Sequence, residues 1–453
     1  MPHRYPPQRA LHDRSETAVS YLEAALARIE DAEGEGAKAF VAVHAETARA
    51  AAENSDRLRA AGIIPSPLSG LTVSIKDLLD EAGQVTRAGS VARDDAPPAF
   101  QDSPVVAQLR AAGAVIVGRT NMTEFAFSGL GLNPHYGTPR NPFGRELGAG
   151  ASGRIPGGSS SGAAVSVSDG MAHVAIGSDT GGSVRIPAAF CGLVGFKPTA
   201  RRVPLTGTLP LSTTLDSIGP LAKTVDLCAQ ADAILAGDPN APVPAAFNVH
   251  GLRLLAPSTM VLDGMDATVA AVYERTLSLL AAAGARIVET SLPVLNDLQA
   301  IGARGGFSAP EAYAWHRDLL ARRGDDYDPR VRSRIEKAAT VTAVDYIEAL
   351  ALRAAFVDAM VAALAPYDAM IMPTVPIIAP LFTEVESDED YTRLNLLALR
   401  NPAIVNLADG CALTLPCHRP GEPPVGVSLV GAPMQDRRIL AIGRALEPLL
   451  RSA

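Results

Sequence analysis

Two serines in one nearly uncharged segment are each preceded by a pair of glycines. Gly157-Gly158-Ser159 and Gly181-Gly182-Ser183 place the two serines 24 residues apart, and a helix-compatible run follows each of them. Consecutive backbone N–H groups at a helix start can hold an anion or a developing oxyanion. Gly-Ser pairs are also common in turns, and serine is a good helix N-cap, so one pair alone would indicate only a turn.

The glycines and serines of this region point to backbone loops inside the protein. The chain has 39 glycines in 453 residues, and residues 129–195 hold 16 of them. Residues 155–184 contain seven serines but only two charged side chains, so most of this stretch must be buried. A buried segment this rich in glycine needs backbone conformations that side chains would forbid.

The rest of the sequence predicts a frame of alternating strands and helices. Strands are expected at 71–75, 114–118, 252–257, 285–290, 367–373, 411–416 and 426–431. Helices are expected at 45–61, 103–113, 121–128, 267–284, 309–322, 343–365 and 436–451. A further N-terminal helix would begin at a capping box of Asp13 and Glu16 and present Val19, Leu22, Leu26 and Ile29 on one face. This alternation predicts an α/β sheet with helices on both faces.

The composition excludes several classes of protein. With 47% hydrophobic and 19% charged residues the chain is not disordered, and a net charge of −8 without a basic run argues against a nucleic-acid partner. The first residues have no apolar core of a secretory signal, and the apolar run 369–382 is too short to span a membrane. Four scattered cysteines argue against disulfides and zinc. We expect a cytoplasmic protein without metal or cofactor.

The glycine-rich segment resembles the signature of the amidase signature family. GGSSSG at 157–162 is followed by DTGGSVRIP at 179–187, and GLTVSIKD at 70–77 resembles the lysine motif of that family. Further similar segments are TNMTEF at 120–125, GTPRNP at 137–142, DSIGPLAKTVDL at 216–227, YDAMIMPT at 367–374 and PVGVSLVG at 424–431. The resemblance implies one large domain over 1–453 with a twisted mixed sheet. Its catalytic core would cover about 65–230, and the substrate wall and C-terminal sheet region about 250–453.

The resemblance also implies a Ser–Ser–Lys triad. Ser183 would be the nucleophile, Ser159 the bridging serine with a cis peptide bond, and Lys76 the base. The chemistry is coherent, because Ser–Lys pairs are an alternative to Ser–His pairs. A lysine has a reference pKa near ~10.4, and burial at the end of an apolar strand would lower that pKa so that the amine can accept a proton.

The same resemblance assigns the residues around the nucleophile. The backbone N–H groups of Thr180, Gly181, Gly182 and Ser183 would hold the oxyanion, and the backbone of Ala126 would line the pocket. Asp179 and Arg185 are expected to shape the nucleophile loop, because a buried charge pair is usually structural.

Two other motifs compete with this interpretation. Residues 158–162 satisfy GxSxG, the nucleophile elbow of α/β-hydrolases, but residues 144–157 look like a loop rather than the strand that the elbow requires. His173, in an apolar run, is interpreted as a core histidine. Residues 148–153 satisfy GxGxxG, but no strand precedes them. An α/β-hydrolase-type esterase and a catalytically silent binding scaffold stay open as alternatives.

Within the family, the sequence favours a stand-alone amidase that cleaves a small carboxamide. The alternative is the A subunit of the tRNA-dependent amidotransferases, which usually has an acidic residue where an ungapped alignment places Leu399 here. The substrate wall would include Phe307, Tyr313, Trp315 and His316, although such aromatic clusters are more often core. A small-molecule amide is the expected partner, without nucleic acid or membrane. The oligomeric state is open, with a homodimer as one candidate.

Overall fold

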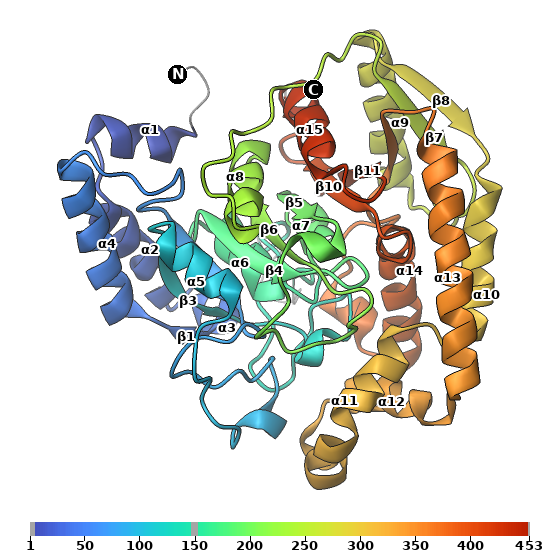
Figure 1. Ribbon diagram of the computed structural model, residues 1–453, viewed down its shortest axis with the longest axis horizontal. Helices are drawn as coiled ribbons and strands as arrows, with labels where there is room; N and C mark the ends of the chain where they lie inside the picture. The colour runs from blue at the N-terminus through green and yellow to red at the C-terminus, as the bar shows by residue number, and fades with distance from the viewer. Residues whose placement is uncertain (1–4, 146–152, 452–453) are drawn as a thin grey trace.

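The computed structural model describes residues 5–145 and 153–451, and within them eleven strands form one mixed sheet (Figure 1). The sheet order is β1-β3-β2-β4-β6-β5-β10-β11-β9-β7-β8. The strands are β1 (Phe40–Val43), β2 (Thr72–Lys76), β3 (Val115–Thr120), β4 (Val174–Ser178), β5 (Val194–Lys197), β6 (Ile218–Ala222), β7 (Arg253–Pro257), β8 (Arg286–Thr290), β9 (Ala369–Pro373), β10 (Cys411–Pro416) and β11 (Gly426–Gly431). The sheet runs unbroken from the N-terminal to the C-terminal region, so the chain forms one α/β domain, as the sequence predicted.

Parallel and antiparallel pairs divide the sheet into segments. β2 pairs in parallel with both β3 and β4, and β7 pairs in parallel with β8 and β9. The pairs between β4 and β9, through β6, β5, β10 and β11, are antiparallel. The carboxyl ends of β2 and β4 therefore meet at one edge of the sheet, where ligand sites of α/β proteins commonly lie.

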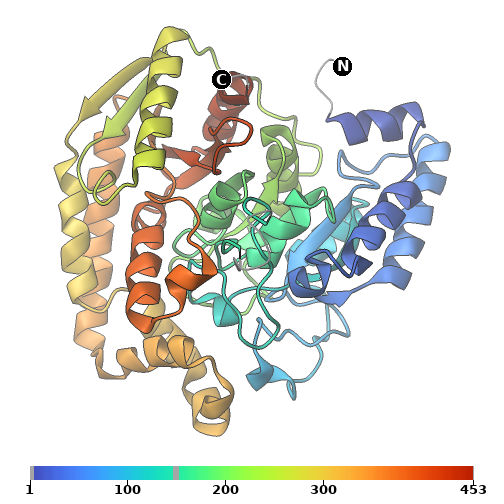
Figure 2. The same ribbon diagram turned by 180° about the vertical axis from the view of Figure 1, so that it is seen from behind.

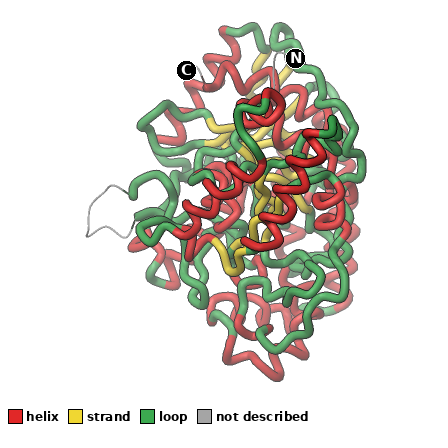
Figure 3. Tube along the Cα trace, turned by 90° about the vertical axis from the view of Figure 1, so that its left-hand side faces the viewer, coloured by secondary structure: helices red, strands yellow, loops and turns green. Residues whose placement is uncertain are grey.

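Helices cover both faces of the sheet, as Figures 2 and 3 show from two further sides. They are α1 (Pro6–Asp13), α2 (Ala18–Glu30), α3 (Gly36–Ala39), α4 (Ala45–Ala60), α5 (Pro104–Ala111), α6 (Ser161–Ser168), α7 (Arg185–Phe190), α8 (Val225–Leu235), α9 (Ala267–Ala282), α10 (Leu298–Ala303), α11 (Ser308–Arg323), α12 (Pro329–Glu336), α13 (Ala343–Leu364), α14 (Asp388–Leu407) and α15 (Asp436–Arg451). Side chains alternate across each strand, so the two faces can be assigned from β3. Val115 and Val117 pack with α2, α4 and α6, whereas Ile116 packs in the cluster that contains α5, α8 and α15.

Two local predictions were wrong, and one long helix was missed. Asp13 ends α1 instead of capping the next helix, and the capping box of α2 is formed by Thr17 and Ser20. The helix expected near 121–128 is only a 3-10 turn, Glu124–Ala126. Helix α14 was not predicted, because Pro402 lies inside it and proline is a poor residue for a helix interior.

Candidate active site

Lys76 ends β2 with its side chain on the α6 side of the sheet. Val73 and Ile75 belong to the cluster on the α5 side, so alternation turns Ser74 and Lys76 towards α6. A hydrogen bond of 2.9 Å between the hydroxyls of Ser74 and Ser166 in α6 agrees with this assignment. The Lys76 side chain is fully buried, and its Nζ donates hydrogen bonds to Ser159 Oγ at 2.7 Å and to Ser178 Oγ at 2.8 Å.

Burial makes Lys76 a usable base. Desolvation lowers the pKa of Lys76 to about 7, although the charges of Asp216 and Asp179 oppose this shift. A lysine with this pKa exchanges its proton near neutral pH. The neutral amine has a lone pair that can accept a proton from a hydroxyl within hydrogen-bond distance.

The loop of Ser159 is tied to its surroundings by backbone hydrogen bonds. The Gly158–Ser159 peptide bond is cis. Gly158 N–H donates to the carbonyl of Gly129 at 2.8 Å, and the Ser159 carbonyl accepts from Thr123 N–H at 3.1 Å. A side chain at Gly158 would not fit, because its Cβ would lie 2.6 Å from the backbone nitrogen of Gly131. The glycine in this motif is therefore required by close backbone packing.

The loop of Ser183 follows β4 and leads into α7. Ser183 is only 3% exposed, and its carbonyl accepts a hydrogen bond of 3.3 Å from Ser160 N–H. This bond joins the loop of Ser183 to the loop of Ser159. The two Gly-Gly-Ser motifs, 24 residues apart in sequence, therefore lie side by side, next to the carboxyl ends of β2 and β4.

A buried ion pair shapes the Ser183 loop from inside. The Asp179 carboxylate accepts hydrogen bonds from Arg185 Nε at 3.0 Å and from one terminal Arg185 nitrogen at 2.8 Å. It also accepts bonds from the backbone N–H groups of Gly182 and Val184. Although burial opposes it, the Arg185 charge together with hydrogen bonds from Arg185 and Asn406 holds the pKa of Asp179 well below its usual range. Asp179 and Arg185 thus fix the path of the chain around Ser183.

The four predicted oxyanion donors differ in their hydrogen bonds. Gly182 N–H is bound to the Asp179 carboxylate at 2.8 Å. Among the described residues, none accepts a hydrogen bond from the N–H of Thr180, Gly181 or Ser183. These three N–H groups could donate hydrogen bonds to an oxyanion.

Asp216 anchors the same loop from the other side. Its Oδ1 accepts a hydrogen bond of 2.5 Å from the Thr180 hydroxyl, and its Oδ2 accepts bonds from the backbone N–H groups of Leu211 and Ser212. Burial raises the pKa of Asp216 to about 6. Asp216 lies in the DSIGP segment that the sequence singled out, but its contact with Thr180 could not be deduced from spacing.

Ala126 lies in a turn with unusual backbone conformation. Phe125 and Ala126 have φ angles of 50° and 60°, in the left-handed region that non-glycine residues seldom adopt. Both side chains are buried. The turn begins at Thr123, which holds the Ser159 carbonyl, so the segment of Ala126 adjoins the Ser159 loop.

One face of α14 lies along both loops. Asn395 Oδ1 accepts hydrogen bonds from the Ser128 hydroxyl at 2.9 Å and from Gly129 N–H at 2.8 Å. At the other end of the helix, Asn406 Nδ2 donates 3.0 Å bonds to the Asp179 backbone carbonyl and carboxylate. The helix therefore braces the segment behind Gly158 and the ion pair behind Ser183.

Between these two asparagines the same helix face is apolar. A Cβ placed on Gly181 would lie 3.6 Å from the Leu399 side chain, and one placed on Gly129 would lie 3.2 Å from it. A Cβ on Gly182 would meet Pro402 at only 2.5 Å. Leu399 is therefore an apolar wall beside the predicted oxyanion donors.

Sequence reasoning did not assign roles to Ser178, Asn395 and Asn406. Only its place just before the nucleophile loop marks Ser178 in the sequence, because the pairing of its strand with β2 is known from the sheet alone. The two asparagines lie more than 200 residues from the loops that they hold, so no local signal marks them.

The competing motifs gain no support from the geometry. No strand directly precedes Gly158, and the Ser160 hydroxyl donates to the Ser178 carbonyl at 3.4 Å instead of contacting a histidine. His173 is a partly buried residue whose Nδ1 lies 2.7 Å from the Thr72 hydroxyl. The GxGxxG match at 148–153 lies almost wholly outside the described residues.

The predicted aromatic wall divides into two groups. Phe307 packs on Tyr346, with ring centroids 5.9 Å apart, whereas Trp315 and His316 pack on Phe125 beside the Ala126 turn. Only the second group adjoins the candidate site.

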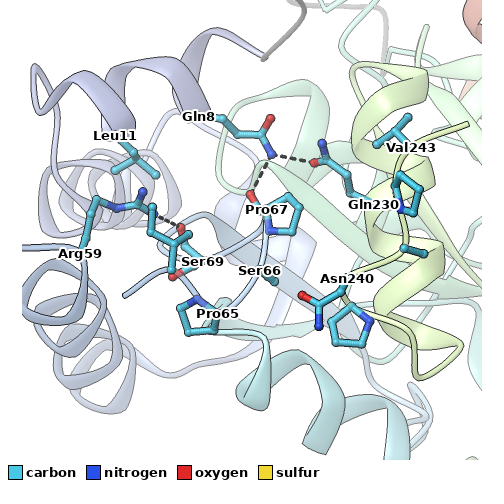
Figure 4. Close-up of a pocket in the computed structure, with 14 residues that line it drawn as sticks. Gln8, Leu11, Arg59, Pro65, Ser66, Pro67, Ser69, Gln230, Asn240 and Val243 are labelled. Atoms are coloured by element: carbon cyan, nitrogen blue, oxygen red, sulfur yellow. Dashed lines mark hydrogen bonds between the residues drawn. The ribbon is translucent and has the colours of Figure 1, made fainter. Parts of the chain in front are cut away.

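Other candidate sites are few among the described residues. The four cysteines are buried free thiols, and no group of three or more potential ligands there could hold a metal ion. None of the described helices has the length and hydropathy needed to cross a membrane. A cavity of about 430 Å³ lies between α1, the end of α4 and residues 239–243, away from the loops of Ser159 and Ser183 (Figure 4).

Comparison with known proteins agrees with the fold and the motifs. Residues 20–440 match the Amidase family. The 2-amino-5-chloromuconic acid deaminase of Comamonas testosteroni is 39% identical over 89% of this chain and 86% of its own length. The A subunit of the glutamyl-tRNA(Gln) amidotransferase of Roseiflexus sp. (strain RS-1) is 33% identical over 95% of this chain and 93% of its own. A solved structure described as an amidase superposes with a TM-score of 0.86 at 33% identity, covering 98% of each chain.

The chain belongs to the amidase signature family. The match covers nearly the whole chain and therefore includes the whole sheet and the helices on both of its faces. Membership of this family supports the assignment of the protein as an amidohydrolase.

Proposed function

We propose that the protein is a stand-alone amidohydrolase that cleaves the C–N bond of a small carboxamide through an acyl-enzyme on Ser183. The observation that carries the proposal is the buried Lys76 amine, 2.7 Å from the Ser159 hydroxyl. A lysine with a pKa of about 7 is suited to general-base work near neutral pH.

The hydrogen bond between Lys76 and Ser159 supports the first step of a relay of protons. Neutral Lys76 takes the proton of the Ser159 hydroxyl while Ser159 takes that of Ser183, and Ser183 Oγ forms a bond to the substrate carbonyl carbon. The carbonyl oxygen becomes an oxyanion beside the N–H groups of Thr180, Gly181 and Ser183. When the C–N bond breaks, the relay returns a proton to the leaving amine. Water then attacks the acyl-enzyme by the same relay and releases the carboxylate.

Ser178 has a supporting role in this proposal. Its hydroxyl accepts one N–H of Lys76 at 2.8 Å, on the strand next to β2. This contact fixes the direction of the Lys76 side chain, so that its lone pair can be turned towards Ser159. Ser178 is thus a positioning residue.

The apolar wall at Leu399 favours a stand-alone enzyme over the glutaminase component of an amidotransferase. Because a glutamine substrate carries a charged amino group, an acidic side chain would be needed to bind it. Leu399 offers only methyl groups beside Gly129 and Gly181. We therefore expect small aromatic or aliphatic primary amides to be cleaved and glutamine to be a poor substrate, in a cytoplasmic enzyme.

Two serine variants test the proposal directly. The protein is supplied with a panel of primary amides, including glutamine, and ammonia release is measured. Ser183→Ala should lose turnover, whereas Ser160→Ala, which removes the serine of the GxSxG alternative, should retain most of it. Loss of activity in Ser160→Ala with full activity in Ser183→Ala would overturn the proposal. A panel that includes unsaturated amino acids with two carboxylates also tests the reaction named for the Comamonas relative.

Two further assays separate the remaining alternatives. A catalytically silent scaffold would not react with a fluorophosphonate, whereas the proposed enzyme should be labelled at Ser183. Glutaminase activity together with co-purification of the other amidotransferase components would favour the alternative of an amidotransferase A subunit.

A further inference from the structure

A buried histidine beside the Ala126 turn has an unused hydrogen-bonding atom. His316 in α11 is completely buried, and its Nε2 has no hydrogen-bond partner among the described residues. Buried polar atoms in native proteins are nearly always paired, so an unpaired one calls for an explanation such as a bound ligand.

The hydrogen bond on the other side of the ring identifies Nε2 as a donor. His316 Nδ1 lies 2.9 Å from the hydroxyl of Tyr327. That hydroxyl has no other acceptor among the described residues, so we assign its proton to this hydrogen bond, which places the proton of a neutral ring on Nε2. Burial lowers the pKa of His316 to about 3, so the ring is neutral with this single N–H. The missing partner is therefore a hydrogen-bond acceptor.

The positive charge of Arg93 acts on His316, because it also lowers the pKa of the ring. The guanidinium of Arg93 stacks over the Trp315 ring at 5.5 Å from its centroid, and the Trp315 ring is 4.5 Å from that of His316. Arg93 Nε donates to the Thr86 carbonyl at 2.7 Å, and its two terminal nitrogens donate to no residue that the structure describes. A cation and an N–H donor that both belong to side chains in contact with the Trp315 ring favour a carboxylate as the acceptor.

The carboxylates near Arg93 form no hydrogen bond with its terminal nitrogens among the described residues. Three acidic side chains act on the charge of Arg93, and each has a partner of its own. These are Asp77 with Arg119, Asp80 with Thr86 and Asp95 with Arg323. The terminal guanidinium nitrogens therefore remain available for a ligand.

This group of residues adjoins the catalytic loops, and its Trp315 side chain is partly exposed. The His316 ring is 4.4 Å from that of Phe125, the residue before Ala126, and Thr123 of the same turn holds the Ser159 carbonyl. Trp315 is 37% exposed, so the group can be reached once the indole moves.

We infer that Arg93 and His316 form a subsite for a carboxylate carried at the far end of the substrate from the scissile amide. This inference rests on the proposed amidohydrolase function and names its substrate class, the monoamides of dicarboxylic acids. The carboxylate accepts hydrogen bonds from the Arg93 guanidinium and from His316 Nε2, and its binding moves the Trp315 indole, which contacts both side chains.

Trp315 is the only tryptophan of the chain, so its fluorescence reports on this subsite without any turnover. The full chain with Ser183→Ala, which keeps amides intact, is titrated with monoamides of succinic, glutaric, adipic and pimelic acid and with their chain-matched neutral amides. At least one monoamide should cause a saturable change and bind about tenfold or more tightly than its neutral partner. Equal binding, or no change with any acid, would overturn the subsite.

Substitutions then assign the preference to its residues. Arg93→Met and His316→Phe should each remove most of the preference for the carboxylate. Arg87→Met is the matched control, because Arg87 pairs with Asp94 on the same segment, and it should keep the preference. Retention of the preference in Arg93→Met would contradict the inference.

Turnover by the unsubstituted enzyme separates this inference from the proposed function. Hydrolysis of neutral amides and monoamides at equal kcat/KM would disprove the subsite and leave the amidohydrolase intact. Carboxylate-dependent quenching of Trp315 without hydrolysis of any amide would support the subsite and disprove the function.

Discussion

The two Gly-Gly-Ser loops have the same tripeptide, but their surroundings use it in opposite ways. In the first loop the side chain of Ser159 is bound, because its hydroxyl accepts a hydrogen bond from Lys76, and the backbone around it is also bound to Gly129 and Thr123. In the second loop the backbone N–H groups of Gly181 and Ser183 have no acceptor among the described residues.

The charged groups behind the two loops also differ. The first loop contacts Lys76, a buried lysine whose pKa is lowered by burial. The second is built on a paired aspartate and arginine whose charges are fixed. The titrating group, Lys76, thus lies at the Ser159 loop, which would transfer protons. The ion pair lies at the Ser183 loop, which would keep its conformation while an oxyanion forms. Identical glycine motifs acquire different roles from the residues behind them.

The largest expected effect comes from removing the base of the first loop. Lys76→Ala should lower kcat/KM for amides by about 10⁴-fold, as for loss of a triad member. In the unsubstituted enzyme kcat/KM should fall as pH drops below about 7, because protonated Lys76 cannot accept a proton. This acidic limb should be absent from the residual activity of the variant.

Lys197 provides the control for this experiment. It is a second buried lysine, with a pKa lowered by burial to about 8, but it donates to the carbonyls of Pro198 and Gly410 instead of to a serine. Lys197→Met should keep the acidic limb near pH 7. If the limb vanished in Lys197→Met and persisted in Lys76→Ala, the assignment of the base would be wrong.

Removing the charge of Asp179 should lower the stability of the protein and disturb the Ser183 loop. Asp179→Asn leaves Arg185 buried without a countercharge, which costs about 3 kcal/mol or more. It also weakens the acceptors that hold the N–H groups of Gly182 and Val184. Urea unfolding and kcat measure the two consequences. A variant as stable and as active as the parent would show that the pair does not shape the loop.

A pair of glycine variants sharpens the view of the second loop. Gly182 has a φ of +128°, and a Cβ there would lie 2.5 Å from Pro402, so Gly182→Ala should cost about 2–4 kcal/mol. Gly181→Ala meets Leu399 at an ordinary 3.6 Å and should cost less than about 1 kcal/mol. Thermal unfolding of both variants checks the difference, and equal losses would contradict the described packing against α14.

The smallest effect concerns the wall that α14 adds to the second loop. Leu399→Ala should raise KM for hydrophobic amides about tenfold with a smaller change in kcat, because the side chain packs beside the oxyanion donors without reacting. Leu396→Ala on the same helix is the control, since Leu396 is 63% exposed. Steady-state kinetics with both variants test this, and equal KM values would remove Leu399 from the substrate wall.

The parts of the fold that the sequence predicted are those with local signals. The strands at 411–416 and 426–431 and the helix at 436–451 were placed within a residue of their ends, because apolar runs and helical periodicity are local properties. The helix expected near 121–128 failed for a physical reason, since Phe125 and Ala126 take left-handed conformations that a helix cannot contain.

The candidate site was predictable where the family resemblance joined its motifs. The proximity of Lys76 to Ser159 followed from the family resemblance, and the structure gives the distance. The contributions of Asn395 and Asn406 depend on α14, a helix hidden by Pro402, whereas Leu399 was singled out by alignment with the family. Ser178 required knowledge that β2 and β4 are neighbours, which is a property of the sheet and not of either strand.

The central claim, that Lys76 activates Ser183 through Ser159, is tested most directly by covalent labelling. A fluorophosphonate is added to the unsubstituted enzyme and to Lys76→Ala, the labelling rate is measured by intact-mass spectrometry, and the modified residue is located by peptide mapping. We predict labelling of Ser183 alone, with a rate at least about 100-fold lower in Lys76→Ala. Labelling of Ser160, or a rate that does not depend on Lys76, would contradict the account.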